Sequence, residues 1–232
     1  MRINRFFTDR GICSRREADR AVEQGRITIN GRTAVLGDKV LDTDVITFDG
    51  QVVGAKQNRP LVIAYNKPIG VVCTSDDRVP DNIIEAVNHP ERIFTIGRLD
   101  QMSEGLILLT NRGELVNQIL RARYGNEKEY HVELNEELPE LDRRRLEKGV
   151  VILERKTAPC RIEPMGPRRH RWILTEGRNR QIRRMAEVVG LTVRRLRRVR
   201  VMNIELGDLP RGKWRDLFPE EITELLSLLQ GD

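Results

Sequence analysis

The sequence predicts an α+β fold in which a small N-terminal module precedes a larger domain with a mostly antiparallel sheet. Short apolar runs with the composition of buried strands follow one another without helical crossovers, which is typical of antiparallel pairing. Modest helical patterns lie between some of these runs. Gly, Gln, Asn and Pro gather near residues 50–60, where no hydrophobic period appears. We therefore expect domains over 1–50 and 61–232, joined by a linker over 51–60.

The N-terminal module has clear local signals. Apolar residues at helical spacing over 3–7 predict a first helix. Ser14 and Glu17 have the spacing of a capping box, in which each side chain binds the other residue's backbone N–H, so a second helix should begin there. Residues 27–29 alternate like a strand, and Asn30-Gly31 predicts a tight turn after it.

The larger domain is predicted element by element from its apolar runs and its turn residues. Residues 194–200 are mostly Arg, with Leu196 and Val199 between them. This pattern indicates a strand at the edge of a sheet, with one side facing phosphates. Trp172 and Trp214 are expected in the core. We expect strands over residues 61–65, 71–74, 93–96, 106–109, 128–134, 150–153, 160–163 and 172–175, and helices over 83–87, over 114–123, after Pro139 and after Gly177.

Charge is concentrated in one part of the chain. The 232 residues carry a formal net charge of +6, but residues 155–200 hold 15 Lys and Arg against 3 Asp and Glu. Nearly all of these cations are Arg, which binds phosphate bidentately and stacks on bases. A solvated surface normally mixes both signs, so this stretch favours a nucleic-acid partner. Aromatic residues make up only 4% of the chain, which argues against a long platform for stacking single strands.

Several protein classes are excluded by the same sequence. No apolar run reaches the roughly 20 residues that span a membrane, and the N-terminus lacks the pattern of a secretory signal. Cys13, Cys73 and Cys160 lie far apart without a CxxC pair, so neither zinc nor disulfides are expected. The three His residues show no metal spacing. We expect a protein of the reducing cytoplasm, without a membrane anchor.

Asp100 is the leading candidate for chemistry. Residues 97–110 read GRLDQMSEGLILLT, which sets Asp100 in a Gly-bounded turn between two apolar strands. A carboxylate held between two core strands has little freedom, as suits a nucleophile or a general base. Closing the turn through bonds to its own backbone is the structural alternative.

Two further residues of the larger domain are considered, Tyr130 and Arg183. Tyr130 lies in a predicted strand, where the common role of a Tyr is half-buried packing. Arg183 falls at the border of the apolar stripe of the helix after Gly177, and an inward Arg needs a partner. Asp100 would serve, and an adjacent Arg would lower the pKa of that carboxyl and keep it ionised. A phosphate clamp is the alternative role for Arg183.

The motifs resemble one enzyme family. GRLD followed by a short spacer and GLILLTN resembles the active-site signature of the pseudouridine synthases, and GRNRQIRRM and the Lys-Glu-Tyr triplet at 128–130 agree with it. GICSRREADRAVEQGRITINGR resembles the S4 RNA-binding domain. Together they identify the chain as a member of the S4-domain-containing rRNA pseudouridine synthases (the RsuA/RluB/RluE/RluF family), most similar to the RluF subgroup. Ser103 stands where a Thr is common in that family.

This resemblance implies a fold and a reaction. The fold would be an α+β synthase domain with a central cleft behind a small S4 RNA-binding domain. The reaction would be isomerisation of uridine to pseudouridine in ribosomal RNA, 23S more than 16S, with no redox cofactor or metal. Asp100 would be catalytic through either a covalent adduct or a glycal route, Tyr130 would stack on the flipped uracil, and Arg183 would orient Asp100. Free rRNA or an assembly intermediate is the expected partner of a cytoplasmic monomer. The expected RNA-binding residues are Arg15, Arg16, Arg20, Arg98, Arg178, Arg180 and Arg184.

Two other functions compete with this one. A noncatalytic S4-type RNA-binding or ribosome-assembly protein would share the basic surface and the N-terminal module. A nucleoside or glycan hydrolase would use a carboxylate too, but it normally needs a second positioned one. Glu104 is near in the sequence, and nothing else in the sequence supports it in that role.

Overall fold

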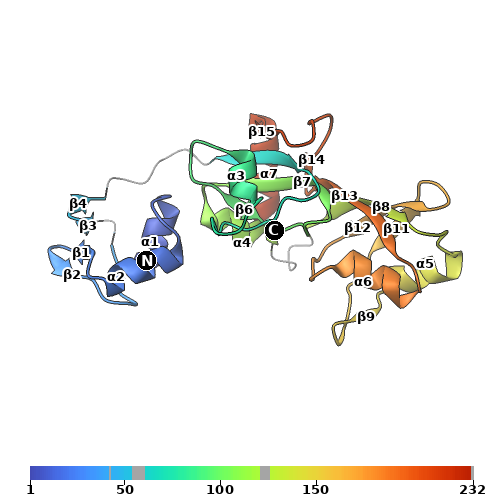
Figure 1. Cartoon of the computed structure of the whole chain (residues 1–232), viewed down its shortest axis with the longest axis horizontal. Coiled ribbons are helices and arrows are strands. Elements are labelled where there is room, and N and C mark those ends of the chain that lie inside the picture. Colours follow the sequence, from blue (N-terminus) through green and yellow to red (C-terminus); the bar gives the residue numbers. More distant parts are fainter. Residues whose placement is uncertain (42, 54–60, 121–125, 231–232) are drawn as a thin grey trace. The chain divides into compact units, whose positions relative to one another are not determined.

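The computed structural model of the protein describes residues 1–41, 43–53, 61–120 and 126–230 (Figure 1). The chain divides into two compact units. The smaller comprises Met1–Leu61 with two short segments, His89–Phe94 and Asn111–Glu114, and the larger comprises the remainder.

The smaller unit is built from two helices and a four-stranded antiparallel sheet of order β2-β1-β3-β4. The capping box is present: Ser14 Oγ accepts from Glu17 N at 3.2 Å, and Ser14 N donates to the Glu17 carboxylate at 2.6 Å. The bond from Ser14 N, with smaller contributions from the Ser14 side chain and Arg92, lowers the pKa of Glu17 to about 2. Apolar side chains of both helices form a core with the sheet. The elements are α1 (Ile3–Asp9), α2 (Arg15–Glu23), β1 (Ile27–Ile29), β2 (Arg32–Thr33), β3 (Ile46–Phe48) and β4 (Gln51–Val52).

The expected linker is shorter than predicted at its start. Gln51 and Val52 pair with β3 as strand β4, since Asp49 and Gly50 both adopt positive φ and turn the chain back. Residues 54–60 of that linker lie outside the described residues.

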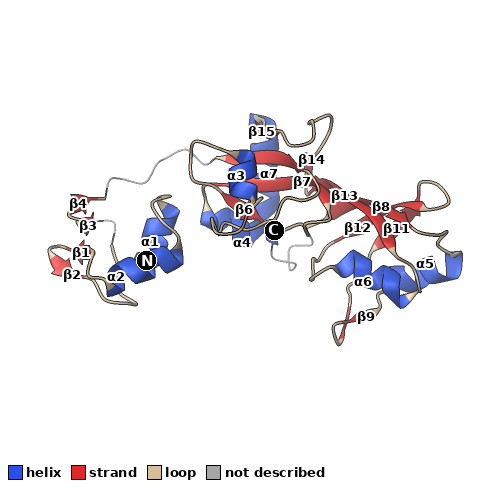
Figure 2. Ribbon diagram, in the orientation of Figure 1, coloured by secondary structure: helices blue, strands red, loops and turns tan. Residues whose placement is uncertain are grey.

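The larger unit is centred on a sheet of order β11-β12-β8-β13-β7-β5-β15, with β14 paired to β13 and β6 to β7 (Figure 2). Neighbouring strands along this order are antiparallel except β7 and β13, which confirms the expected α+β fold with a mostly antiparallel sheet. The strands are β5 (Val62–Lys67), β6 (Phe94–Ile96), β7 (Glu104–Thr110), β8 (Lys128–Leu134), β9 (Val151–Ile152), β10 (Arg155–Lys156), β11 (Arg161–Pro164), β12 (Arg169–Leu174), β13 (Val193–Val201), β14 (Ile204–Glu205) and β15 (Trp214–Asp216).

Helices cover different parts of this sheet. Apolar residues of α4 and α7 pack with β5, β7 and the end of β13 in one core cluster, whereas α5 and α6 lie with β8, β11 and β12 (Figures 1 and 2). Every residue of β7 is buried, as expected for a central strand with helices against it. The helices are α3 (Ile83–Val87), α4 (Gly113–Leu120), α5 (Glu140–Glu147), α6 (Gln181–Val188) and α7 (Pro219–Gln230).

Three predictions for this unit are wrong or only partly met. Residues 71–74 form no strand, because Val72 makes only an isolated bridge to Asn82. Trp214 is 36% exposed rather than buried, whereas Trp172 is in the core as expected. The helix expected over 114–123 is described as far as Leu120, and the rest of it lies outside the described residues.

Strand β13 corrects the expectation of a sheet edge. It lies between β8 and β7 and is therefore central, despite its Arg residues. A central position is tolerated because these side chains have buried or half-buried partners. Arg195 Nε lies 2.5 Å from the Glu104 carboxylate, and Arg198 Nε donates to Leu106 O at 2.7 Å.

Candidate active site

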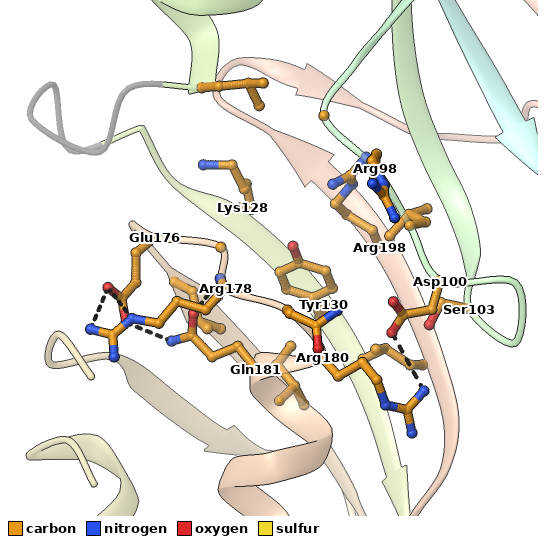
Figure 3. Close-up of a pocket in the computed structure, with 18 residues that line it drawn as sticks. Arg98, Asp100, Ser103, Lys128, Tyr130, Glu176, Arg178, Arg180, Gln181 and Arg198 are labelled. Carbon is orange, nitrogen blue, oxygen red and sulfur yellow. Dashed lines mark hydrogen bonds and ion pairs between the residues drawn. The ribbon is translucent and has the colours of Figure 1, made fainter. Parts of the chain in front are cut away.

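Asp100 lies in the turn that connects β6 to β7. Positive φ at Gly97 begins this turn, and Ser103 N donates to Asp100 O at 2.9 Å. The fully buried Lys67 donates to the carbonyl oxygens of Pro68 and Gln101, which fixes the backbone beside Asp100. The Asp100 side chain is 32% exposed and faces a cavity of about 420 Å³ (Figure 3).

Tyr130 lines the same cavity from β8. It lies opposite Trp172 of β12 and Arg198 of β13, and its side chain is largely buried. In Figure 3 the phenol ring lies between Lys128 on one side and Asp100 with Arg180 on the other. The structure therefore brings Tyr130 and Asp100 to one cavity, although 30 residues separate them in the sequence. A cavity of this size falls in the range of small-ligand sites.

The guanidinium at Asp100 differs from the expected one. Arg180 Nη1 lies 3.9 Å from Asp100 Oδ2, because Arg180 adopts a left-handed conformation at the N-cap of α6 and turns its side chain toward the turn (Figure 3). Arg183 instead donates to Val193 O and Met102 O at 3.0 Å, and to Ser103 Oγ at 3.4 Å.

Arg183 nevertheless contacts the turn that carries Asp100. Its contacts hold the backbone on the carboxyl side of Asp100, and burial lowers its pKa while the Asp100 charge opposes that shift. The expected direct pairing of Arg183 with Asp100 is thus replaced, in the part of the chain that is described, by contact with the turn that carries Asp100.

The expected RNA-binding arginines have different surroundings. Arg98 is exposed and lines the cavity. Arg178 donates to Glu176 and to the carbonyl oxygens of Arg155 and Lys156, so it holds the loop before α6 to the β9–β10 hairpin. Arg184 folds back onto Asn179. In the smaller unit, three arginines lie exposed on α2, namely Arg15, Arg16 and Arg20.

Two cavity residues were missed by sequence reasoning, Lys128 and Arg198. Lys128 is two residues before Tyr130, so in a strand it shares the face of Tyr130, and this spacing was a usable signal. Arg198 could not be found in this way, because only the pairing of β13 with β8 sets it opposite Tyr130. Both side chains are buried.

Neither a metal centre nor a membrane helix is present in the described part of the chain. No three His, Cys, Asp or Glu residues gather there in a way that could hold a metal ion. None of its helices is long and apolar enough to cross a bilayer.

Comparison with known proteins identifies the family. The model of the family described as RNA pseudouridylate synthase matches residues 61–188, which include Asp100, Tyr130 and Arg183. The chain belongs to the RNA pseudouridylate synthase family. The S4 domain model matches residues 1–46 of this synthase, so its fold combines an S4 domain with a pseudouridine synthase domain.

Relatives agree over nearly the whole chain. The synthase is 46% identical over all of its length, and over 80% of the relative, to the dual-specificity RNA pseudouridine synthase RluF of Escherichia coli K12. It is 33% identical, over 98% of its length and 96% of the relative, to the ribosomal large subunit pseudouridine synthase B of Bacillus subtilis. A crystal structure of a pseudouridylate synthase superposes with a TM-score of 0.71 at 27% identity, covering 97% of this chain and 99% of that one.

Proposed function

We propose that this synthase converts specific uridines of ribosomal RNA to pseudouridine, most of all in 23S rRNA. The relatives named for RNA and for the large ribosomal subunit support rRNA as the substrate. We propose further that residues 1–50 bind structured RNA, that 61–232 carry the chemistry, and that the enzyme acts as a cytoplasmic monomer.

One observation supports the catalytic assignment. Asp100 and Tyr130 line one cavity with Arg180, and this cavity has room for a single extruded nucleotide. Asp100 is the proposed catalytic carboxylate and Tyr130 the proposed stacking platform for uracil. Arg183 is the proposed positioning residue, since it binds the backbone of the turn that carries Asp100. The residues proposed to bind the RNA backbone are Arg15, Arg16, Arg20, Arg98, Arg178, Arg180 and Arg184.

The reaction needs no external electrons. The bond from C1′ to N1 of uracil breaks, and a bond from C1′ to C5 of the same base forms. The C5 proton is lost and N1 gains one, so atoms and charge balance. Asp100 would act as a nucleophile toward C1′ or would remove the C2′ proton, and both routes begin from an ionised carboxylate.

The test uses ribosomal RNA from a strain of the source organism that lacks this gene. Wild-type protein should create pseudouridine in this RNA, measured by chromatography of the digested nucleosides. Asp100→Asn should lower the rate at least about 10³-fold, because the nucleophile or base is lost. Asp208→Asn, at an exposed carboxylate outside the cavity, is the matched control and should retain the wild-type rate.

Tyr130 separates stacking from simple packing. Tyr130→Phe keeps the aromatic face and should retain most activity, whereas Tyr130→Leu should lose about 1–3 kcal/mol of base binding. Wild-type protein that binds rRNA but leaves every uridine unchanged would favour the noncatalytic S4-type reading. Release of free uracil would favour the hydrolase.

A further inference from the structure

The cavity contains two buried cations that have no carboxylate partner among the described residues. Lys128 is 6% exposed and Arg198 is 4% exposed. Lys128 Nζ donates to Asn126 O at 2.8 Å, and Arg198 Nε to Leu106 O. Arg198 Nη2 is buried and has no hydrogen-bond partner within the described part of the chain. An unpaired buried charge costs several kcal/mol, so this arrangement calls for an explanation.

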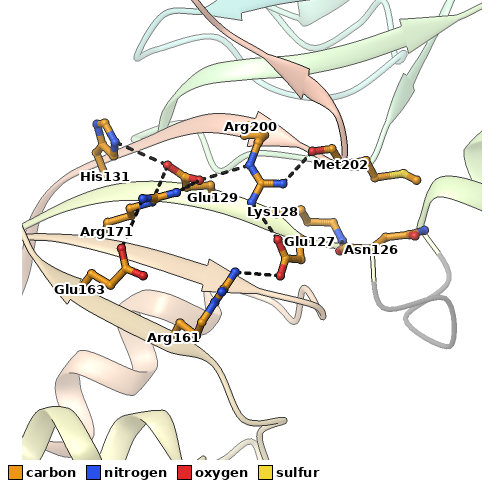
Figure 4. A network of polar contacts seen from close by, with 10 residues as sticks. All are labelled: Asn126, Glu127, Lys128, Glu129, His131, Arg161, Glu163, Arg171, Arg200 and Met202. Atoms are coloured by element: carbon orange, nitrogen blue, oxygen red, sulfur yellow. Dashed lines mark hydrogen bonds and ion pairs between the residues drawn. The ribbon is translucent and has the colours of Figure 1, made fainter. Parts of the chain in front are cut away.

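The glutamates next to Lys128 in the sequence do not neutralise it. Side chains alternate along β8, so Glu127 and Glu129 point to the opposite face of the sheet from Lys128 (Figure 4). There Arg200 binds both carboxylates, and Arg171 lies 2.9 Å from Glu129. The charges of Glu127 and Glu129 are therefore already paired on the far face.

Each of the two cations raises the free-energy cost of burying the other. Burial, together with the smaller effect of the nearby Arg198 charge, lowers the pKa of Lys128 to about 8. Tyr130 of β8 is paired in register with Arg198 of β13. Lys128 is two residues before Tyr130 on β8, so its side chain lies on the same face of the sheet as these two. The other charged residues that line the cavity are Arg98, Asp100, Glu176, Arg178 and Arg180.

Exposure within the cavity distinguishes two possible anions, a phosphate and the base itself. The Arg180 side chain is 45% exposed and that of Asp100 is 32% exposed, so both lie nearer the mouth than Lys128 and Arg198. Asp100 must reach the sugar at C1′ or C2′. A group deeper than Asp100 therefore meets the base, while the phosphates remain at the mouth with Arg98 and Arg180.

We propose that Lys128 and Arg198 stabilise the uracil anion that forms when the glycosidic bond breaks. This inference depends on the proposed function of Asp100 and Tyr130. When C1′–N1 breaks, the bonding pair stays on the ring, and the negative charge spreads over N1, O2 and O4. C1′ is then bonded to Asp100 or joined to C2′ by a double bond. Because both routes release the same anion, the role holds for either. Later C5 bonds to C1′ and the anion is consumed.

The cations suit this task because they are in place before the charge develops. Preorganised donors in a buried site stabilise a developing anion without reorganisation, and loss of one typically costs about 10²-fold in rate. The unpartnered Arg198 Nη2 and the two remaining Lys128 hydrogens are donors of this kind. Tyr130 would hold the free base in plane between them while it turns from N1 to C5.

The test measures single-turnover rates with excess enzyme on rRNA from the deletion strain. Lys128→Met keeps the length of the side chain and removes its charge, and it should lower the rate constant about 10²-fold while the Kd for RNA stays within twofold. Lys148→Met, at an exposed position outside the cavity, removes the same charge and should retain the wild-type rate. Near-ultraviolet circular dichroism from the buried Trp172 reports whether the fold around Tyr130 is intact.

A second variant keeps the test independent of folding. In the wild type the rate should fall as pH rises above about 8, since Lys128 loses its proton. Lys128→Arg stays charged at every accessible pH and should abolish that alkaline fall. A fall that persists unchanged in Lys128→Arg would overturn the inference.

Other outcomes are equally distinct. If Lys128→Met leaves the rate constant unchanged but weakens binding and lowers the salt slope by about one, Lys128 contacts a phosphate and the inference is wrong. If Lys128→Met changes neither the rate constant nor the Kd for RNA, the inference is also wrong. In both cases the proposed function is still supported if the wild-type protein makes pseudouridine. If the wild-type protein makes none, the proposed function itself is wrong.

Discussion

Gly105 lies in the parallel pairing of β7 with β13 in the large sheet, and its replacement should disturb both stability and catalysis. It has φ +103°, and it is opposite Arg198 in the parallel pairing of β7 with β13. A Cβ on Gly105 would lie 2.2 Å from Arg198 O and 2.8 Å from Arg198 N. Ordinary contact begins at 3.4 Å, so the strands would have to part by roughly 1 Å.

The magnitude follows from two separate costs. Overpacking costs about 1–3 kcal/mol, and a positive φ adds about 1–2 kcal/mol for a residue with a Cβ. Gly105→Ala should therefore lower the free energy of unfolding by about 2–5 kcal/mol, which corresponds to a fall in Tm of about 4–20 °C for a domain of this size. Parting β7 from β13 also moves Asp100 relative to Tyr130, and a displacement of about 1 Å is enough to lower the rate about 10²-fold.

Gly70 provides the matched control for this prediction. Its φ of +98° is nearly that of Gly105, but a Cβ there would meet nothing within 4 Å. Calorimetry of Gly70→Ala should therefore show only the smaller backbone cost. Equal losses of Tm for the two variants would show that the close contact of Gly105 with β13 is not what destabilises Gly105→Ala, and would refute the reasoning.

Three further predictions concern helices α2 and α6. Ser14→Ala removes the cap of α2 and should cost about 1 kcal/mol in the unfolding of the smaller unit, measured by thermal denaturation; no loss would contradict the role of the capping box. Replacing Arg16 and Arg20 with Gln should lower the slope of log K for RNA against log salt by up to about 2, and an unchanged slope would remove α2 from RNA binding. Arg183→Lys cannot keep both carbonyl contacts, whereas Arg180→Lys keeps a cation near Asp100, so Arg183→Lys should lower kcat more. A larger loss of kcat for Arg180→Lys would contradict these roles.

Local patterns in the sequence were enough to predict most elements. Apolar spacing and caps located the helices of the smaller unit and strand β8, because these depend on neighbouring residues. The predicted position of β13 was wrong, because its Arg residues suggested a sheet edge. Only long-range ion pairs, such as that of Arg195 with Glu104, make a central position tolerable. The partner of Asp100 was missed for a different reason: the left-handed φ of Arg180 is not visible in a helical pattern.

The distribution of charge within the described sheet supports the proposed role of the cavity. Buried carboxylates elsewhere in the described sheet are neutralised by arginines, as Glu104 is by Arg195 and Arg211. Such pairs contribute little net stability, but leaving one member unpaired would cost several kcal/mol. Lys128 and Arg198 are buried cations without a carboxylate partner among the described residues, and they line the cavity that Asp100 and Tyr130 also line. Under the proposed mechanism, a base that becomes an anion during the reaction would neutralise both cations at once, which would account for their burial without a carboxylate partner.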